Sequence, residues 1–281
     1  IFGKDLYESA KPKLLDPYDA GMLDYDEIEL TPDYTTMPDG PFKLWCHRDA
    51  RDNPVATGQY CIGCDISAGL GGSYSSNSVA VVVDTVTGQQ VAEFATNTMR
   101  PERFADYVIA MCNWFRDAYL IWESNGPPGG AFGRQVLERT YGNIYYREID
   151  NRSYSKKTKN PGWHSTDKNK LSVLTQMSKA VQTGEFTIRS NKLLEECRQY
   201  VYKDGRVVHS RSVRTQDDSS KGQAHGDRVI AAALAWHAAK DRPATKDDVE
   251  EFTLNKDTPQ FTMAHRINTY MAEVKVKDKW G

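Results

Sequence analysis

The sequence predicts a mixed α/β fold, in which three antiparallel strands continue into parallel strands and helices cover the faces of the sheet. Two observations carry this prediction. From about Gly58 the chain shows three β-type apolar segments joined by short polar connections, and amphipathic segments then alternate with short apolar ones. A chain of 281 residues has room for one large domain with extensions or for two ordinary domains.

The first three strands are expected at 60–66, 78–84 and 90–95. A loop rich in glycine and serine joins the first two, and Gly88 lies in the turn between the second and the third. Connections of this kind join neighbouring antiparallel strands. We therefore expect an antiparallel meander.

Helices and strands then alternate. Phe104, Val108 and Phe115 recur at helical spacing and predict a helix over 101–117, and the apolar run at 119–123 predicts a strand. The expected elements that follow are a helix at 131–140, a strand at 144–149, an irregular segment at 150–166, a helix at 167–183, a strand at 186–188, a helix at 191–200, a hairpin that turns at 203–206 and a helix at 225–240.

The two ends of the chain differ from its middle. Residues 1–55 contain 12 Asp and Glu against 6 Lys and Arg and show no sustained periodicity, whereas the remaining residues contain 26 and 30. We expect residues 1–57 to form an acidic arm or linker and residues 58–243 to form the main domain. Residues 244–281 are expected to form a tail with one amphipathic helix. Because the chain begins at Ile1 rather than at methionine, we expect a piece of a longer protein.

Five cysteines, an odd number in a chain too large to need disulfides, favour a reducing compartment. No apolar run approaches the roughly 20 residues that span a bilayer, so no membrane partner is expected. Cys61 and Cys64 have the spacing of half a zinc site, but in a strand they point to opposite faces. Buried cysteine is the favoured interpretation.

Three carboxylates occupy positions that local structure does not require. Asp65 ends the first strand, Glu123 ends the apolar strand Tyr119–Glu123, and Asp227 lies in the first turn of an alanine-rich helix. Each has an ordinary explanation as a turn cap, an arginine partner or a group that complements the helix dipole. Together at one sheet edge they would repel one another strongly unless cations neutralised them.

Hard divalent ions such as Mg²⁺ or Mn²⁺ take oxygen ligands of this kind. Two such ions about 3.5–4 Å apart activate water and stabilise the leaving oxygen of a phosphodiester. We therefore expect Asp65, Glu123 and Asp227 to be metal ligands and catalytic residues, with Asp65 as the bridge between two Mg²⁺ or Mn²⁺ ions. Candidates for a fourth ligand are Asp84, Asp217 and Asp218.

This order of strands, helices and acids is similar to that of the ribonuclease H-like superfamily. More specifically, the chain resembles the nuclease domain of the large terminase subunit of tailed bacteriophages over residues 58–240. The matching segments are IGCDISAG (62–69), IWESNGPPGG (121–130), GWHST with the lysine-bearing helix that follows (162–170), and HGDRVIAAALAW (225–236).

The resemblance implies a metal-dependent endonuclease that cuts concatemeric double-stranded viral DNA in the host cytoplasm, at the prohead portal. It implies a packaging ATPase domain, the portal protein and the small terminase subunit as partners, and we expect the isolated domain to be monomeric. The loop 67–77 lacks an acid that some family members carry, and no phosphate-binding loop occurs, so the ATPase domain is expected outside this chain. Residues 1–57 are interpreted as the connection toward it.

The segment 151–170 contains six Lys and Arg against one Asp, together with Tyr154 and Trp163. A basic segment with aromatic residues suits binding of DNA, although a solvated loop is the ordinary alternative. His164 and His225 are not needed as bases if metal ions activate the water. The residues expected to bind DNA are Arg152, Lys156, Lys157, Lys159, Trp163, Lys170, Arg211 and Arg214.

Two other functions remain open at this point. A nuclease of the Holliday-junction resolvase type would share the fold and favour branched DNA. A module without catalytic activity would instead dock the portal or small terminase protein, with the tail helix at about 260–274 as the contact.

Overall fold

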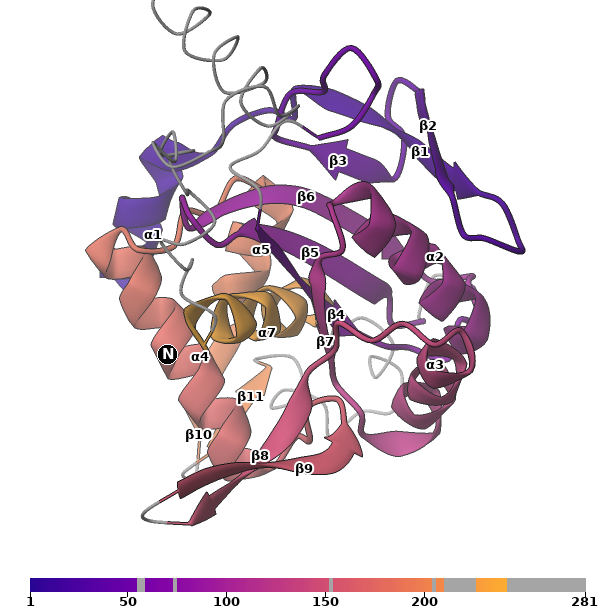
Figure 1. The fold of residues 1–281 in the computed structure, drawn as a ribbon. Helices are drawn as coiled ribbons and strands as arrows, with labels where there is room; N and C mark the ends of the chain where they lie inside the picture. Colours follow the sequence, from indigo (N-terminus) through magenta and orange to yellow (C-terminus); the bar gives the residue numbers. More distant parts are fainter. Residues whose placement is uncertain (55–58, 73–74, 152–153, 204–205, 210–225, 242–281) are drawn as a thin grey trace, which may run out of the picture. The chain divides into compact units, whose positions relative to one another are not determined.

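A seven-stranded mixed sheet organises the part of the chain that the computed structural model describes, residues 1–54, 59–72, 75–151, 154–203, 206–209 and 226–241 (Figure 1). The described elements belong to one compact unit, Ile1–Pro243. In chain order they are α1 (Lys4–Ala10), a 3-10 turn (Lys11–Lys13), β1 (Asp19–Tyr25), β2 (Pro32–Thr36), β3 (Phe42–Leu44), β4 (Tyr60–Asp65), β5 (Ser78–Asp84), β6 (Gln89–Thr96), α2 (Pro101–Trp114), β7 (Tyr119–Trp122), α3 (Gly126–Glu138), β8 (Tyr146–Asn151), β9 (Tyr154–Pro161), α4 (Asp167–Thr183), α5 (Asn191–Cys197), β10 (Tyr200–Lys203), β11 (Arg206–His209) and α7 (Asp227–Asp241).

The predicted meander and the mixed sheet are confirmed. The strand order is β2-β1-β3-β6-β5-β4-β7, and β4, β5 and β6 are antiparallel neighbours. In register, Asp65 lies opposite Val79 and Tyr60 lies opposite Asp84. β7 adds to β4 in parallel, with Cys64 opposite Trp122. The carboxyl ends of β4 and β7 therefore meet at one edge of the sheet.

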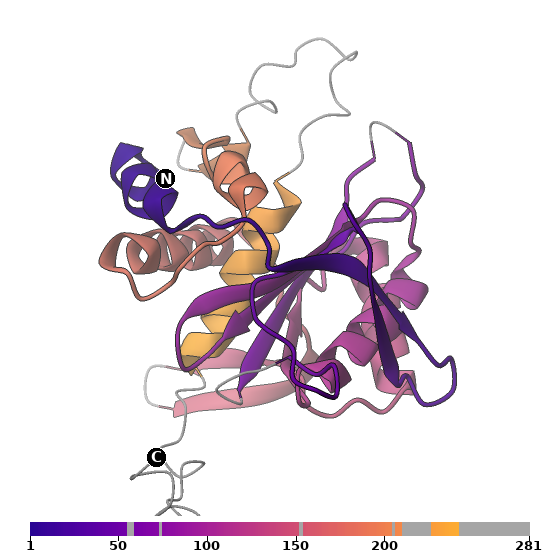
Figure 2. The same cartoon turned by 90° about the horizontal axis from the view of Figure 1, so that it is seen from above.

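The two faces of the sheet are covered by different helices (Figure 2). Cys61 of β4 lies in a core with residues of α4, α5 and α7, and Cys64 lies in a second core with residues of α2 and α3. Both cysteines are fully buried. Their opposite orientation, expected from the alternation of side chains along a strand, is confirmed.

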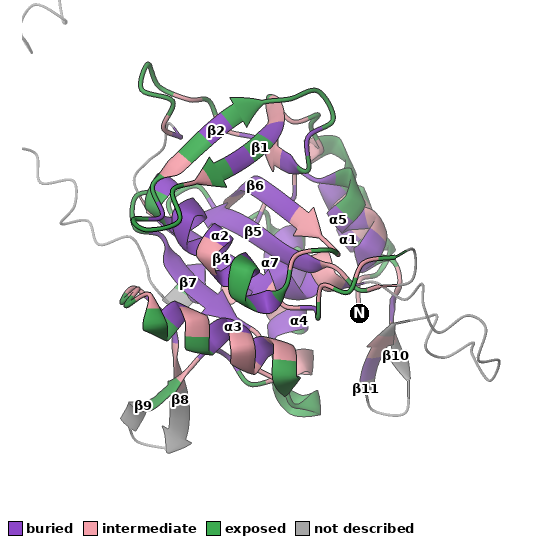
Figure 3. Cartoon of the chain, turned by 90° about the vertical axis from the view of Figure 1, so that its right-hand side faces the viewer, coloured by how far each residue is buried: buried purple, intermediate pink, exposed green. Residues whose placement is uncertain are grey.

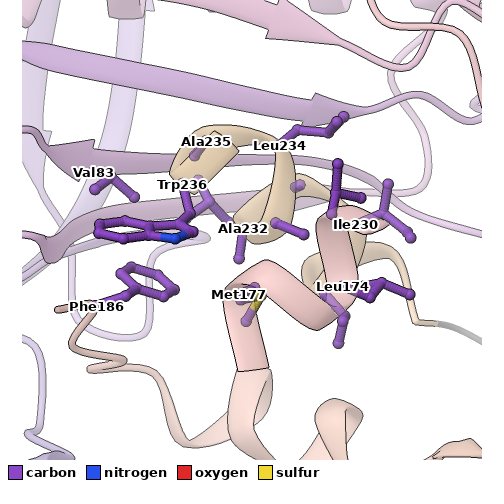
Figure 4. Packing of buried hydrophobic residues seen from close by; sticks show 14 of the residues in the cluster. Val83, Leu174, Met177, Phe186, Ile230, Ala232, Leu234, Ala235 and Trp236 are labelled. Atoms are coloured by element: carbon purple, nitrogen blue, oxygen red, sulfur yellow. The ribbon is translucent and has the colours of Figure 1, made fainter. Parts of the chain in front are cut away.

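Helix α7 packs directly on the sheet because the contact is built from very small residues. A Cβ placed on Gly63 would lie 2.2 Å from the carbonyl oxygen of Ala231 and 2.3 Å from the backbone nitrogen of Ala235. Figure 4 shows this helix between the sheet and Leu174 and Met177 of α4. The glycine of β4 therefore allows α7 to approach the strand that carries Asp65.

The expectation that regular structure begins near Gly58 is wrong. β3 pairs with β6 and β1 pairs with β3, so the N-terminal strands extend the sheet. Phe42 and Leu44 are fully buried. Figure 3 shows exposed residues along β1 and β2, whereas β5 is buried. β1 and β2 contain few strongly apolar residues, and β3 spans only three residues, so the apolar alternation of these strands is weak in the sequence. The role of residues 1–57 as a connection to another domain stays a prediction.

Three other segments differ from expectation. The segment 150–166 contains β9, which forms a hairpin with β8, and the expected strand at 186–188 is a single bridge from Thr187 to Gln89. Helix α3 begins at Gly126 because Pro127 and Pro128 occupy its first turn, a position that proline tolerates. The expected tail helix at about 260–274 lies outside the described residues. None of the described helices is long and apolar enough to cross a membrane.

Candidate functional site

Asp65 and Glu123 lie beside each other at the carboxyl edge of the sheet. Asp65 is the last residue of β4, and Glu123 directly follows β7. The backbone N–H of Glu123 donates to the carbonyl oxygen of Cys64 at 3.0 Å. Because β4 and β7 are parallel, their two acidic ends leave the sheet at the same level.

The packing of α3 fixes the backbone of Glu123. A Cβ on Gly129 would lie 2.4 Å from the carbonyl oxygen of Glu123. Only glycine therefore lets the first turns of α3 approach the end of β7 so closely. The glycine-rich segment after Glu123 therefore forms the start of α3 and packs against the end of β7.

Asp227 reaches the same edge from the first residue of α7. Its Oδ2 accepts a hydrogen bond of 2.7 Å from the backbone N–H of Asn77, which directly precedes β5. Val79 of β5 lies opposite Asp65. The structure thus brings together three carboxylates that stand far apart in the sequence, and we name Asp65, Glu123 and Asp227 the acidic edge.

The electrostatics of Asp65 reflect this proximity. Burial raises the pKa of the Asp65 carboxyl well above its ordinary value, and the carboxylates of Glu123 and Asp227 raise it further. The ammonium group of Lys170 and the backbone N–H of Ile66 oppose the shift. Negative charge at the acidic edge therefore exceeds what the neighbouring positive groups offset.

Lys170 and Tyr200 border the acidic edge. The Lys170 ammonium lies 5.8 Å from the centre of the Tyr200 ring, within the range of a cation–π contact. Burial raises the pKa of Tyr200 well above its ordinary value, and Asp65 and Asp227 raise it further. The Tyr200 hydroxyl donates to the carbonyl oxygen of Gly226 at 3.0 Å and so supports the residue before Asp227.

The acidic edge fits a hard divalent cation in its chemistry. Its donors are carboxylate oxygens, and a bound cation would remove the repulsion that raises the pKa of Asp65. Within the described ranges, however, no group of three or more His, Cys, Asp or Glu is arranged so that it could hold a metal ion. The three carboxylates are neighbours, and binding would have to draw their oxygens closer together.

A pocket of about 450 Å³ opens beside Asp65 and Asp227. The other residues that line it come from the loop after β4: Ile66, Ser67, Ala68, Gly69, Leu70, Ser75, Ser76 and Asn77. The loop is tied to β5, because Ser78 Oγ accepts a hydrogen bond of 3.0 Å from the backbone N–H of Ser67. The described part of this wall adds hydroxyl, amide and backbone groups to the site, and no further acid.

One candidate for a fourth ligand is excluded. Asp84 lies opposite Tyr60, at the other end of β5 from Val79, which is about 16 Å along the strand. Its Oδ1 accepts hydrogen bonds from the backbone N–H groups of Val86 and Thr87, so it caps the following turn. The other two candidates, Asp217 and Asp218, lie outside the described residues.

A second pocket, of about 370 Å³, lies beyond Glu123 along the same edge. The backbone of Trp163 forms a parallel β-bridge with that of Glu123, and Arg147 Nη2 donates to Ser124 Oγ at 2.8 Å. The pocket is lined by Tyr145, Arg147, Trp163, His164, Asn169, Ser172, Val173 and His237. Arginine and histidine without acidic neighbours in the lining make this pocket suitable for an anion.

The residues expected to bind DNA differ in where the structure places them. Trp163 is only 5 % exposed and packs in the core, which argues against a stacking contact with DNA. Lys170 lies at the acidic edge, whereas Lys159 is exposed on β9. Lys156 and Lys157 lie on β9, opposite Ile149 and Glu148. Arg152, Arg211 and Arg214, like His225, lie outside the described residues.

Sequence reasoning missed Arg147 and Arg228. Arg147 carries no pattern that separates it from a surface arginine. Arg228 does, because it is charged, directly follows Asp227 and opens a helix of alanine and other apolar residues. A buried arginine requires acidic partners, and the structure supplies Glu93 and Glu196.

Comparison with known proteins identifies the fold. No protein-family model matches the chain, and no curated protein matches it. The large terminase nuclease of the thermophilic phage G20c with bound magnesium aligns at a TM-score of 0.54 and 15% identity, covering 83% of this chain and 96% of that one. The structure of this nuclease with bound cobalt aligns at 0.52 and 15% identity, with 83% and 96% covered. Another structure of it, described without a metal, aligns at 0.51 and 16% identity, with 83% and 97% covered. The chain therefore has the ribonuclease H-like fold of large terminase nuclease domains, as the sequence predicts.

Proposed function

We propose that this protein is a divalent-metal-dependent endonuclease that cuts double-stranded DNA during phage DNA packaging. The acidic edge carries the proposal, because Glu123 and Asp227 lie beside Asp65 at the carboxyl ends of β4 and β7. Burial raises the pKa of Asp65 there, and these two carboxylates raise it further. The likeness to a terminase nuclease that binds magnesium supports it.

Asp65 is the proposed bridge between two Mg²⁺ or Mn²⁺ ions, and Glu123 and Asp227 are the proposed outer ligands. When bound, such a pair of ions activates a water and stabilises the leaving oxygen of the phosphodiester. The protein orients the ligands: β4 and β7 set the spacing of Asp65 and Glu123, and the Asn77 N–H holds one oxygen of Asp227. Lys170 offsets part of the negative charge.

DNA would lie along the carboxyl edge of the sheet, from the acidic edge toward the pocket of Arg147. One strand would present its scissile phosphate to the acidic edge, and Arg147, His164 and Lys159 would contact neighbouring phosphates. Contacts to phosphate carry no base preference, and they weaken as salt rises. The proposed activity is therefore not sequence-selective by itself.

The likeness to terminase nucleases also suggests the setting. We propose that the protein works in the host cytoplasm at the prohead portal, together with a packaging ATPase domain, the portal protein and the small terminase subunit. The isolated domain is proposed to be monomeric.

Plasmid cleavage tests the activity. We expect nicked and linear products with Mn²⁺ or Mg²⁺ and none with EDTA, and loss of cleavage in Asp65→Asn and Asp227→Asn. Asp33→Asn, an exposed carboxylate on β2, is the control and should cleave like the parent. Metal-dependent cleavage that survives both site variants would contradict the proposed site.

Two further outcomes would point to other functions. No cleavage with any metal by the folded protein would favour a docking module. Faster cleavage of a four-way junction than of linear duplex, in parallel reactions, would favour a resolvase.

A further inference from the structure

Arg228 lies in a buried network of charges directly after Asp227. Its Nε donates to Glu93 Oε1 at 2.7 Å, and its Nη1 donates to Glu196 Oε1 at 2.6 Å. The side chains of Arg228, Glu93 and Glu196 are 13%, 4% and 11% exposed. A buried guanidinium between two carboxylates keeps a fixed geometry, because leaving any of the three groups buried and unpaired is strongly unfavourable.

The network connects three elements of the fold. Glu93 is on β6, Glu196 is on α5, and Arg228 is on α7. Gln90 of β6 donates from Nε2 to Glu93 Oε2 at 3.1 Å, and its Oε1 accepts from the backbone N–H of Ser190 at 3.1 Å. Ser190 caps α5, and that helix carries Glu196. The network thus fixes the first turn of α7 to the sheet and to a neighbouring helix.

The backbone of this turn is held as well. Glu196 Oε2 accepts a hydrogen bond of 3.0 Å from the backbone N–H of Arg228, one of the N–H groups at a helix start that have no partner within the helix. Asp227 is the residue immediately before this N–H. Its side chain is held from the other side by the N–H of Asn77.

We infer that Arg228, with Glu93 and Glu196, is the positioning device of the metal centre: it fixes where α7 presents Asp227 to Asp65. The inference rests on the proposed function, since it concerns how the acidic edge is held ready for a cation. Such outer partners of metal ligands change metal affinity about 10- to 100-fold when they are removed.

The described residues contain a matched pair without this role. Arg139, the residue that caps the C-terminus of α3, makes hydrogen bonds of 2.9 and 2.8 Å to both oxygens of Asp106 on α2, among the helices of the opposite face of the sheet. Its partner is also largely buried, at 14% exposed. Arg139→Lys is therefore a control for the loss of a forked, partly buried ion pair.

Direct binding of Mn²⁺ tests the inference without relying on catalysis. Free Mn²⁺ is measured by electron paramagnetic resonance during titration of the parent, Arg228→Lys and Arg139→Lys. Lysine keeps the charge but cannot donate to both carboxylates in the same fork. We expect Arg228→Lys to bind Mn²⁺ about 10-fold more weakly and Arg139→Lys to bind it like the parent.

Folding is checked by thermal unfolding monitored by circular dichroism. If Arg228→Lys does not fold, Glu93→Gln replaces it, because Arg228 then keeps Glu196 as a partner. Reduced Mn²⁺ affinity in a folded network variant would support the inference. Parent-like affinity in a folded network variant, or an equal loss in Arg139→Lys, would overturn it. A parent that binds no Mn²⁺ would instead remove the proposed function.

Discussion

The first two residues of α7 belong to two different clusters of charges. Asp227 is part of the acidic edge, and Arg228 pairs with Glu93 and Glu196. The carboxylates of the two clusters are neutralised in different ways. Glu93 and Glu196 receive a buried guanidinium from Arg228. At the acidic edge, Lys170 only partly opposes the shift that its neighbours impose on Asp65. The protein thus supplies its own cation where a helix start is fixed to the sheet, and leaves negative charge only partly offset at the proposed metal site.

The largest expected effect separates the clusters by activity. Asp65→Asn should lower metal-dependent plasmid cleavage by at least about 100-fold, because it removes a ligand charge and not only an outer partner. Glu93→Gln, compared at saturating Mn²⁺, should keep most of the activity. Similar losses in the two variants would remove the functional distinction.

The next effect is on stability and concerns the network of Arg228, Glu93 and Glu196. Arg228→Met leaves Glu93 and Glu196 buried without their cation and should lower the free energy of unfolding by about 3–5 kcal/mol. Urea denaturation measures this, with Arg198→Met as the control, because Arg198 pairs with Glu195 at the surface. A cost no larger than that of the control would show that the network does not hold the fold.

At the acidic edge, loss of a charge should raise the free energy of unfolding, whereas loss of Arg228 should lower it. The pKa of Asp65 is raised in the folded protein, so its ionised form destabilises the fold at every pH above its unfolded pKa. Asp65→Asn should therefore raise the free energy of unfolding in EDTA at pH 7. Urea denaturation in EDTA would contradict this by showing a variant less stable than the parent.

The last prediction concerns the pH dependence of stability. Burial raises the pKa of Glu196 from 4.5 to about 7, against the opposing effect of Arg228. The folded protein then holds this proton more tightly than the unfolded chain, so the contribution of Glu196 to stability is present below pH 4.5 and is lost toward pH 7. Glu196→Gln should flatten the decrease of stability over this range, measured by denaturation at several pH values. An unchanged slope would mean that another group titrates there.

The sequence predicted the parts of the fold that follow regular periodicity. The meander of β4, β5 and β6 and the helix α4 lie where apolar spacing placed them. Residues 1–54 did not yield to this reasoning, because β3 owes its place to pairing with β6, and β1 owes its place to pairing with β3. Pairing between distant segments leaves only a weak pattern in short strands.

The site was predictable to a similar extent. Asp65, Glu123 and Asp227 could be chosen from their positions at the ends of predicted elements, and the structure places them together. Arg147 could not, because its partners come from distant segments. The position of Arg228 at the start of an apolar helix indicates a buried charge, but its partners Glu93 and Glu196 could not be read from the sequence. Trp163 was chosen for its basic surroundings, but its ring belongs to the core.

The most direct test of the account is calorimetric titration of the apo protein with Mn²⁺, alongside Asp65→Asn and the control Asp33→Asn. We expect saturable binding by the parent and the control, and loss of that binding in Asp65→Asn. Binding of equal affinity and stoichiometry in Asp65→Asn, or no binding by the folded parent, would contradict the claim that the acidic edge is a divalent metal site.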